Sequence, residues 1–182
     1  MNVILASNSP RRKELLAREG IDFKTIPSNY NEIENFGLTP QKYVEYLAFN
    51  KAKSVFEVNK GVVIGADTIV VFNGKILGKP KDKDDAIFML KTLSSSTHEV
   101  ITGYSIISKE KSITGNEITK VTFKSLTDKQ IVDYVNTGSP LDKAGAYGIQ
   151  DGDFLVEKIV GDYDNVVGLP VLKIKKLLTE FV

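Results

Sequence analysis

The chain has 182 residues and a formal net charge of +1, from 24 basic and 23 acidic side chains. This length suffices for one sizeable hydrophobic core, or for two small lobes that share one. The near-neutral charge disfavours a binder of duplex nucleic acid, and the absence of cysteine excludes disulfides and thiolate metal sites. No segment resembles a signal peptide, and no apolar stretch approaches the roughly 20 residues of a membrane span. We therefore expect a cytoplasmic protein without a membrane partner.

The first predicted strand, Val3–Ala6, ends in a small polar loop that leads into a predicted helix over Pro10–Glu19. Ser9 suits the N-cap position, and the proline after it suits the first helical position. Arg11 and Arg12 then lie in the first helical turn. Two cations at the positive end of a helix macrodipole are unfavourable unless an anion binds there. The loop therefore indicates an anion site, with a pair of solvated arginines as the alternative.

A polar loop and a long helix follow the predicted strand Phe23–Ile26. Glu32 lies in this loop and is a candidate ligand, although a solvated loop glutamate is the simpler reading. Thr39 and the proline after it repeat the capping signal, and apolar residues at helical spacing continue to Phe56. Lys51 lies near the edge of that apolar stripe. It is either a functional lysine or a surface lysine whose aliphatic chain covers the edge of the stripe.

The strongest predicted strand, Gly61–Phe72, carries an aspartate in its middle. The apolar residues on both sides of Asp67 indicate a strand that is buried on both faces. A carboxylate there costs several kcal/mol unless it is paired, hydrogen-bonded or bound to a metal. Gly65 and Ala66 leave space for a close approach. We therefore predict a functional role for Asp67.

The second half of the chain alternates strands and helices, which indicates the α/β class. Asn73-Gly74 is a preferred hairpin turn, and Lys79 lies between a glycine and a proline in the loop that follows. The remaining predicted elements are a helix capped by Asp82 that ends at Leu93, strands over Val100–Ser108 and Ile118–Lys124 joined by a polar stretch, a helix from the Thr127 capping box to Val135, a turn-rich segment over 140–152, a strand over Phe154–Val160 and a closing helix after Pro170.

These polar residues together favour a hydrolase of phosphate esters or anhydrides. Arginine binds phosphate oxygens bidentately and lysine acts as a point charge, while carboxylates hold a metal and activate water. His98 is the only histidine, so a zinc site is excluded and any metal would be Mg²⁺ or Mn²⁺. The chain lacks a P-loop motif, and a Ser/His/Asp hydrolase would need His98 beside Ser7 or Ser9.

Five ordered motifs resemble those of the Maf, or septum-formation, family of nucleoside triphosphate pyrophosphatases. They are Ser7–Arg12, Gly65–Val70, Gly78–Pro80, Lys143–Gln150 and Asn165–Pro170. The resemblance implies one domain over residues 1–182, with an elongated α/β fold of a mixed sheet and flanking helices. Its two lobes would share a deep central cleft, similar to that of the inosine triphosphate pyrophosphatases. It also implies a metal-dependent attack of water that yields a nucleoside monophosphate and pyrophosphate.

The resemblance further implies a role for individual residues. Asp67 would be the proton acceptor that activates water and, with Glu32, a ligand of Mg²⁺ or Mn²⁺. The triphosphate would be held by Ser7, Arg11, Arg12, Lys51 and Lys79. The residues that would select the base are Arg11, Thr68 and Gln150, because the motifs resemble the branch that acts on dTTP and UTP. An amide such as that of Gln150 offers a uracil edge both a donor and an acceptor.

The chain departs from the family pattern at several positions. Asn31 stands where an aspartate is usual, Ser95 and Ser96 stand where a glycine and a basic residue are usual, and Asp151 stands where a glycine is usual. These departures leave open the preference among canonical and modified pyrimidine triphosphates in the clearing of nucleotide pools. The competing hypothesis is a non-catalytic regulator of septum formation that binds a nucleotide or a protein partner. The sequence also leaves room for a homodimer.

Overall fold

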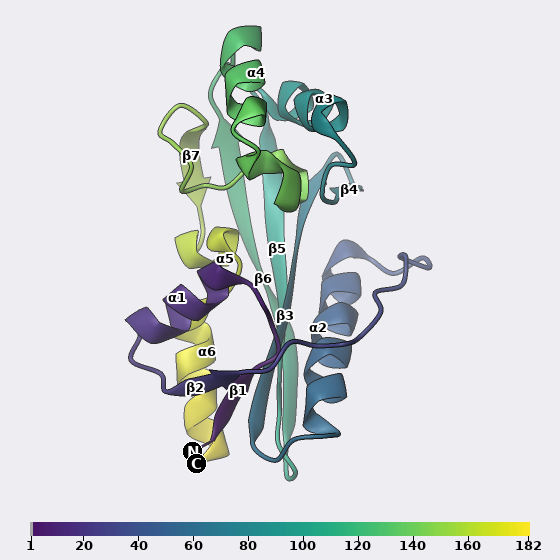
Figure 1. Cartoon of the computed structure of the whole chain (residues 1–182), viewed down its shortest axis with the longest axis vertical. Helices are drawn as coiled ribbons and strands as arrows, with labels where there is room; N and C mark the ends of the chain where they lie inside the picture. The colour runs from purple at the N-terminus through teal and green to yellow at the C-terminus, as the bar shows by residue number, and fades with distance from the viewer. Residues whose placement is uncertain (1) are drawn as a thin grey trace. The chain divides into compact units, whose positions relative to one another are not determined.

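A mixed sheet with flanking helices forms the framework of the protein, which a computed structural model describes over residues 2–182 (Figure 1). The sheet has the order β2-β1-β3-β5-β6-β7, and β4 pairs with β3. The strands are β1 (Val3–Leu5), β2 (Phe23–Thr25), β3 (Val62–Phe72), β4 (Lys75–Leu77), β5 (Thr97–Ile107), β6 (Ser112–Phe123) and β7 (Val156–Val160). The helices are α1 (Pro10–Arg18), α2 (Pro40–Phe56), α3 (Lys83–Leu93), α4 (Asp128–Asn136), α5 (Tyr163–Val167) and α6 (Val171–Leu178), with 3₁₀ turns η1 (Ser139–Asp142), η2 (Ala144–Ala146) and η3 (Thr179–Phe181).

The chain divides into two compact units. Unit 1 contains the described residues up to Thr68, together with Thr102–Glu117 and Gly168–Val182. Unit 2 contains Ile69–Ile101 and Ile118–Val167. Strands β3, β5 and β6 therefore contribute residues to both units. Within residues 2–182, no helix combines the length and the apolar character needed to cross a lipid bilayer.

Unit 1 is built on parallel pairing of β1 with β2 and β3, with Leu5 opposite Thr25 and Ile64. Helix α2 packs against β3 and β5 at two glycines, where a methyl group would not fit. A Cβ atom at Gly65 would lie 2.3 Å from the Ala48 carbonyl oxygen, and one at Gly103 would lie 2.2 Å from that of Val44. Figure 1 shows α2 on one side of the sheet, with α1 and α6 on the other side. The two glycines thus set how closely α2 lies to the middle of β3.

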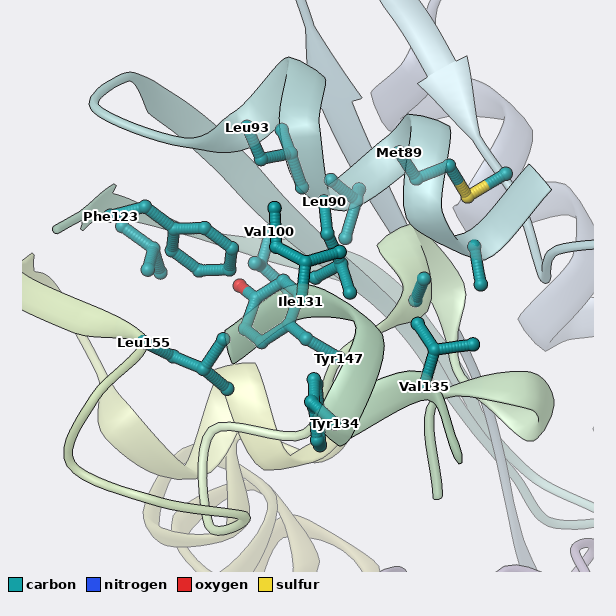
Figure 2. Packing of buried hydrophobic residues seen from close by; sticks show 14 residues of the cluster. Met89, Leu90, Leu93, Val100, Phe123, Ile131, Tyr134, Val135, Tyr147 and Leu155 are labelled. Carbon is teal, nitrogen blue, oxygen red and sulfur yellow. The ribbon is translucent and has the colours of Figure 1, made fainter. Parts of the chain in front are cut away.

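Unit 2 has its own apolar core beneath α3 and α4 (Figure 2). Asp82 caps α3, and Thr127 and Gln130 form both arms of a capping box at α4, as the sequence predicts. The side chains of Phe123, Tyr147 and Leu155 fill the centre of this core and are at most 6% exposed. The core therefore fixes the turn-rich segment that contains η1 and η2, because Tyr147 anchors it.

The predicted boundaries fail at the start of three strands. β5 begins at Thr97 and β7 at Val156. β6 begins at Ser112 rather than at Ile118, so residues 112–117 of the predicted polar connection are strand. Its polar side chains find partners within unit 1: Thr114 bonds the buried Ser105 hydroxyl at 2.8 Å, and the Asn116 amide donates to Glu45 at 2.6 Å. Helix α5 was not predicted, because five residues are too few to show a helical period.

Candidate active site

Asp67 lies where β3 passes beneath α2, in unit 1. Its side chain is 14% exposed, and the strand residues on either side of Ala66–Thr68 are apolar and buried. The glycine at position 65 admits the backbone of α2, with a hypothetical Cβ 2.7 Å from the Ala52 nitrogen. The space that the sequence predicts beside Asp67 is therefore occupied by helix α2, which carries Lys51 on its facing turn.

Lys51 joins two carboxylates in this site. Its Nζ atom lies 2.5 Å from Asp67 Oδ1 and 2.6 Å from Glu32 Oε1. The Lys51 side chain is only 15% exposed, whereas that of Glu32 is 53% exposed. Lys51 is therefore part of the site rather than a surface lysine that covers an apolar edge. The loop glutamate is the part of this trio that faces solvent.

Burial and charge act in opposite directions on Asp67. Burial raises the pKa of the Asp67 carboxyl above its ordinary value, and the neighbouring Glu32 carboxylate adds to that rise. The charges of Lys51 and Arg12 and the hydrogen bond from Lys51 oppose the shift. A buried carboxylate with a raised pKa beside cations is a common feature of a group that accepts a proton during catalysis.

The arginines of the first motif lie at the start of α1, where Ser9 accepts a hydrogen bond from the backbone nitrogen of Arg12. Arg12 donates to the Ser7 hydroxyl at 3.4 Å and to the Ala66 carbonyl at 3.0 Å, so it lies beside the strand that carries Asp67. Arg11 is half-buried in the same helical turn. The structure thus brings Ser7, Arg12, Lys51 and Glu32 around Asp67 within unit 1.

Thr68, the residue after Asp67, is hydrogen-bonded on several sides. Its Oγ1 atom accepts from the Arg12 guanidinium at 3.1 Å and lies 2.9 Å from the Thr102 hydroxyl of β5. Thr102 is fully buried. Sequence reasoning missed Thr102, because a threonine in a strand carries no signal by itself; its contact with the Asp67 strand appears only when β5 is placed beside β3.

The other predicted residues lie in unit 2. Lys79 is exposed in the loop between β4 and α3, and Gln150 is exposed in the turn after η2. The backbone nitrogen of Gly145 donates to the Gly78 carbonyl at 3.1 Å, so these two motifs lie side by side. Gly145 has a positive φ of 68°, and a Cβ there would lie 2.8 Å from Val70, so a glycine is needed at this contact.

Asp151 closes the turn-rich segment of unit 2. Its Oδ2 atom accepts from the Tyr134 hydroxyl at 2.5 Å and from the Ser139 hydroxyl at 2.7 Å. Lys143 donates to the Ser139 carbonyl at 2.5 Å and pairs with Asp142 at 2.9 Å. The departure at position 151 therefore has a structural part in this protein, because the carboxylate fixes the segment next to Gln150.

A tyrosine fixes the loop that carries Glu32. The Tyr43 hydroxyl of α2 donates to the Ile33 carbonyl at 2.9 Å, and its pKa is raised, mainly by burial and then by Asp67 and Glu32. Nearby, a hydrogen bond with Tyr46 raises the pKa of Tyr30 to about 12. Sequence reasoning missed these tyrosines, although Tyr43 belongs to the apolar stripe of α2.

The family model and the similar sequences agree on one family. The Maf family, described as Maf-like protein, matches residues 2–181. A dTTP/UTP pyrophosphatase of Bacillus pumilus is 51% identical over 181 residues, which cover 98% of this chain and 96% of that protein. A dTTP/UTP pyrophosphatase of Thermosipho melanesiensis is 52% identical, with 98% and 97% covered. Among solved structures, a HAM1 protein from Coxiella burnetii matches with a TM-score of 0.54 and 15% identity over 99% of each chain, which shows a shared fold.

Proposed function

The chain belongs to the Maf family, and we propose that it hydrolyses nucleoside triphosphates, dTTP and UTP among them, to the monophosphate and pyrophosphate. The observation that carries this proposal is the Asp67 carboxylate, buried in β3 and 2.5 Å from the Lys51 ammonium. The names of relatives about half identical to this chain support the choice of dTTP and UTP. We place this activity in the cytoplasm and in a single domain over residues 1–182.

In the proposed reaction, Asp67 accepts a proton from a water molecule as the water oxygen bonds to the α-phosphorus. The bond from the α-phosphorus to the bridging oxygen breaks, and pyrophosphate leaves with the bond's electron pair. Asp67 must be ionised to accept the proton, and Lys51 and Arg12 favour the ionised form against the burial that raises the pKa of Asp67. These two cations thus limit the rise in the pKa of Asp67 that burial causes.

The donor set of the site suits a hard divalent cation. Glu32 and Asp67 would hold Mg²⁺ or Mn²⁺, which when bound would polarise phosphate oxygens and offset their charge. Among residues 2–182, no group of three or more His, Cys, Asp or Glu side chains is arranged to hold a metal. Two carboxylates leave most coordination positions to water and phosphate, which is how Mg²⁺ usually binds together with a nucleotide.

The remaining roles follow the charge and position of each side chain. We assign the contacts to the triphosphate to Ser7, Arg11, Lys51 and Lys79, with Arg12 beside them. We assign the choice of the pyrimidine base to Arg11, Thr68 and Gln150. Replacement of Arg11 by alanine should therefore change the ranking of substrates, whereas a residue that binds only phosphate would weaken all of them alike.

A product assay tests the proposal. Purified protein with Mg²⁺ is incubated with dTTP, UTP, dCTP and ATP, and pyrophosphate, orthophosphate and the nucleotide products are quantified. We expect pyrophosphate and the monophosphate in equal amounts, with dTTP and UTP preferred. Release of orthophosphate with a diphosphate would contradict the reaction. Nucleotide binding without any product would instead favour a non-catalytic regulator.

A further inference from the structure

The guanidinium of Arg12 is almost entirely bound to protein groups. Its Nε atom donates to the Gly168 carbonyl at 2.8 Å. One terminal nitrogen donates to the Ala66 carbonyl at 3.0 Å and to the Ser7 hydroxyl at 3.4 Å, and the other donates to the Thr68 hydroxyl at 3.1 Å. Since a guanidinium has five N–H groups, these four contacts leave only one for a ligand. Bidentate binding of a phosphate requires two parallel donors, and Arg12 can offer them only by breaking a contact with the protein.

The contacts of Arg12 lie on both sides of Asp67. Ala66 precedes Asp67 in β3 and Thr68 follows it, so one side chain holds the strand before and after the carboxylate. The third segment is the backbone before α6, where Gly168 has a φ of +135°. This backbone conformation favours glycine and aims the carbonyl oxygen at Arg12.

Thr102 holds the same strand from its other neighbour, β5. Its hydroxyl lies 2.9 Å from that of Thr68 and is buried in the sheet. Thr68 therefore accepts from Arg12 while its hydroxyl is also within hydrogen-bond distance of Thr102 and, at 3.4 Å, of the Gly168 carbonyl. Lys51 differs, because it pairs with the carboxylates of Glu32 and Asp67, whereas Arg12 donates to backbone carbonyl and hydroxyl groups.

We propose that Arg12 is a positioning residue that acts through Asp67 and Thr68, with Thr102 and Gly168 as the other parts of this clamp. The inference rests on the proposed function, since the reaction supplies its main measurement. It assigns Arg12 to the positioning of Asp67 rather than to phosphate binding. Loss of the clamp displaces the carboxylate that accepts the proton, and a displacement of about 1 Å at a reacting group costs on the order of 100-fold in rate. The positive charge of Arg12 alone does not replace the four contacts.

The test separates positioning from phosphate binding. Arg12→Lys keeps the charge but loses the planar set of donors. Values of kcat and KM for dTTP are measured together with the Kd of a non-hydrolysable α,β-methylene analogue of dTTP. We expect kcat to fall about 100-fold, with KM and Kd changed less than about threefold. A retained kcat with KM and Kd raised tenfold or more would overturn the proposal, because it identifies Arg12 as a phosphate ligand.

A second pair of variants keeps the inference testable if Arg12→Lys does not fold. Thr102→Val removes the hydroxyl without a change in charge and should lower kcat about fivefold with KM unchanged, whereas Thr102→Ser should restore kcat. Equal kcat values for Thr102→Val and the wild type would count against the clamp. If the wild type releases no pyrophosphate, the proposed function fails, and hydrogen exchange of the backbone amides then tests the clamp. Faster exchange over Ala66–Thr68 in Thr102→Val than in Thr102→Ser supports the clamp. Equal exchange in the two variants overturns it.

Discussion

Asp67 in unit 1 and His98 in unit 2 are two polar side chains withdrawn from solvent, and they differ in how they are satisfied. In unit 1, Asp67 is an ionisable group surrounded by cations, and its partner Glu32 reaches solvent. In unit 2, His98 lies 2% exposed in an aromatic cluster, where its Nε2 atom is 2.7 Å from the Tyr147 hydroxyl. Among the residues that the structure describes, its Nδ1 atom has no hydrogen-bond partner.

The difference separates a group for which we propose a chemical role from one that packs in an aromatic core. The ring of His98 makes edge-to-face contacts with Phe123 and Tyr147, at centroid distances of 5.0 and 5.4 Å. Burial lowers the pKa of His98 to about 4. The neutral histidine therefore behaves as an aromatic core residue, whereas the charges around Asp67 favour the ionised form. The proposed catalytic group is thus the one that neighbouring charges and a solvent-exposed partner accompany.

The largest effect should come from Asp67→Asn. The amide keeps the volume of the side chain but cannot accept the proton, so we expect the rate of pyrophosphate release from dTTP to fall by about 10²–10⁴-fold. Because burial raises the pKa of Asp67, its ionised form weakens the fold at neutral pH, and the free energy of unfolding should not fall. Turnover and urea unfolding are measured on the same preparation. Retained turnover would remove Asp67 from the mechanism.

The contrast between the two sites also explains what the sequence could predict. The sequence predicts a role for Asp67 because a carboxylate within an apolar strand violates the pattern. The structure confirms the predicted caps of α1, α2 and α4, because capping depends on neighbouring residues. The extension of β6 back to Ser112 was not predicted, because its polar residues find partners on other elements. The contacts of Thr102 and Gly168 join segments far apart in the chain, so no local pattern indicates them. The tested predictions thus succeed where the cause is local.

The next effect is the pH dependence of stability. The pKa of His98 is lowered from 6.5 to about 4, so the unfolded chain binds the proton more tightly and protonation favours unfolding. This contribution to stability is present above pH 6.5 and is lost as the pH falls towards 4, at about 1.4 kcal/mol per pH unit and about 3 kcal/mol in total. Asp67 acts with the opposite sign, because its raised pKa favours the folded state on acidification.

Urea unfolding between pH 7 and 4 measures this dependence. His98→Gln removes the titration and keeps a polar side chain, so the difference in stability between the variant and the wild type should shrink or reverse as the pH falls. A difference in stability that is constant with pH would mean that His98 does not titrate in this range. The electrostatic contrast drawn between His98 and Asp67 would then be wrong.

A smaller effect concerns the metal. Lys51 holds its ammonium between the carboxylates of Glu32 and Asp67, so it competes with a divalent cation for them. Lys51→Met should therefore tighten the binding of Mn²⁺ to the nucleotide-free protein by about tenfold while it lowers turnover. Electron paramagnetic resonance measures free Mn²⁺ directly. Lys53→Met, two residues along α2 and paired with Glu57 at the surface, is the matched control and should leave both quantities unchanged. Weaker Mn²⁺ binding in Lys51→Met would show that Lys51 supports the metal site instead.

The smallest effect, and the sharpest test of the comparison, is Tyr147→Phe. Tyr147 belongs to the Lys143–Gln150 motif, yet its hydroxyl bonds His98 within the core of unit 2 rather than a group near solvent. The ring of phenylalanine keeps the edge contact with Phe123, whose centroid is 4.7 Å away, so only one hydrogen bond is lost. We expect the free energy of unfolding to fall by about 1 kcal/mol, with kcat, KM and the ranking of dTTP over other triphosphates unchanged. A changed order of preference among triphosphates, with unchanged stability, would mean that Tyr147 shapes the site that binds the base. The buried groups of unit 2 could then no longer be called purely structural.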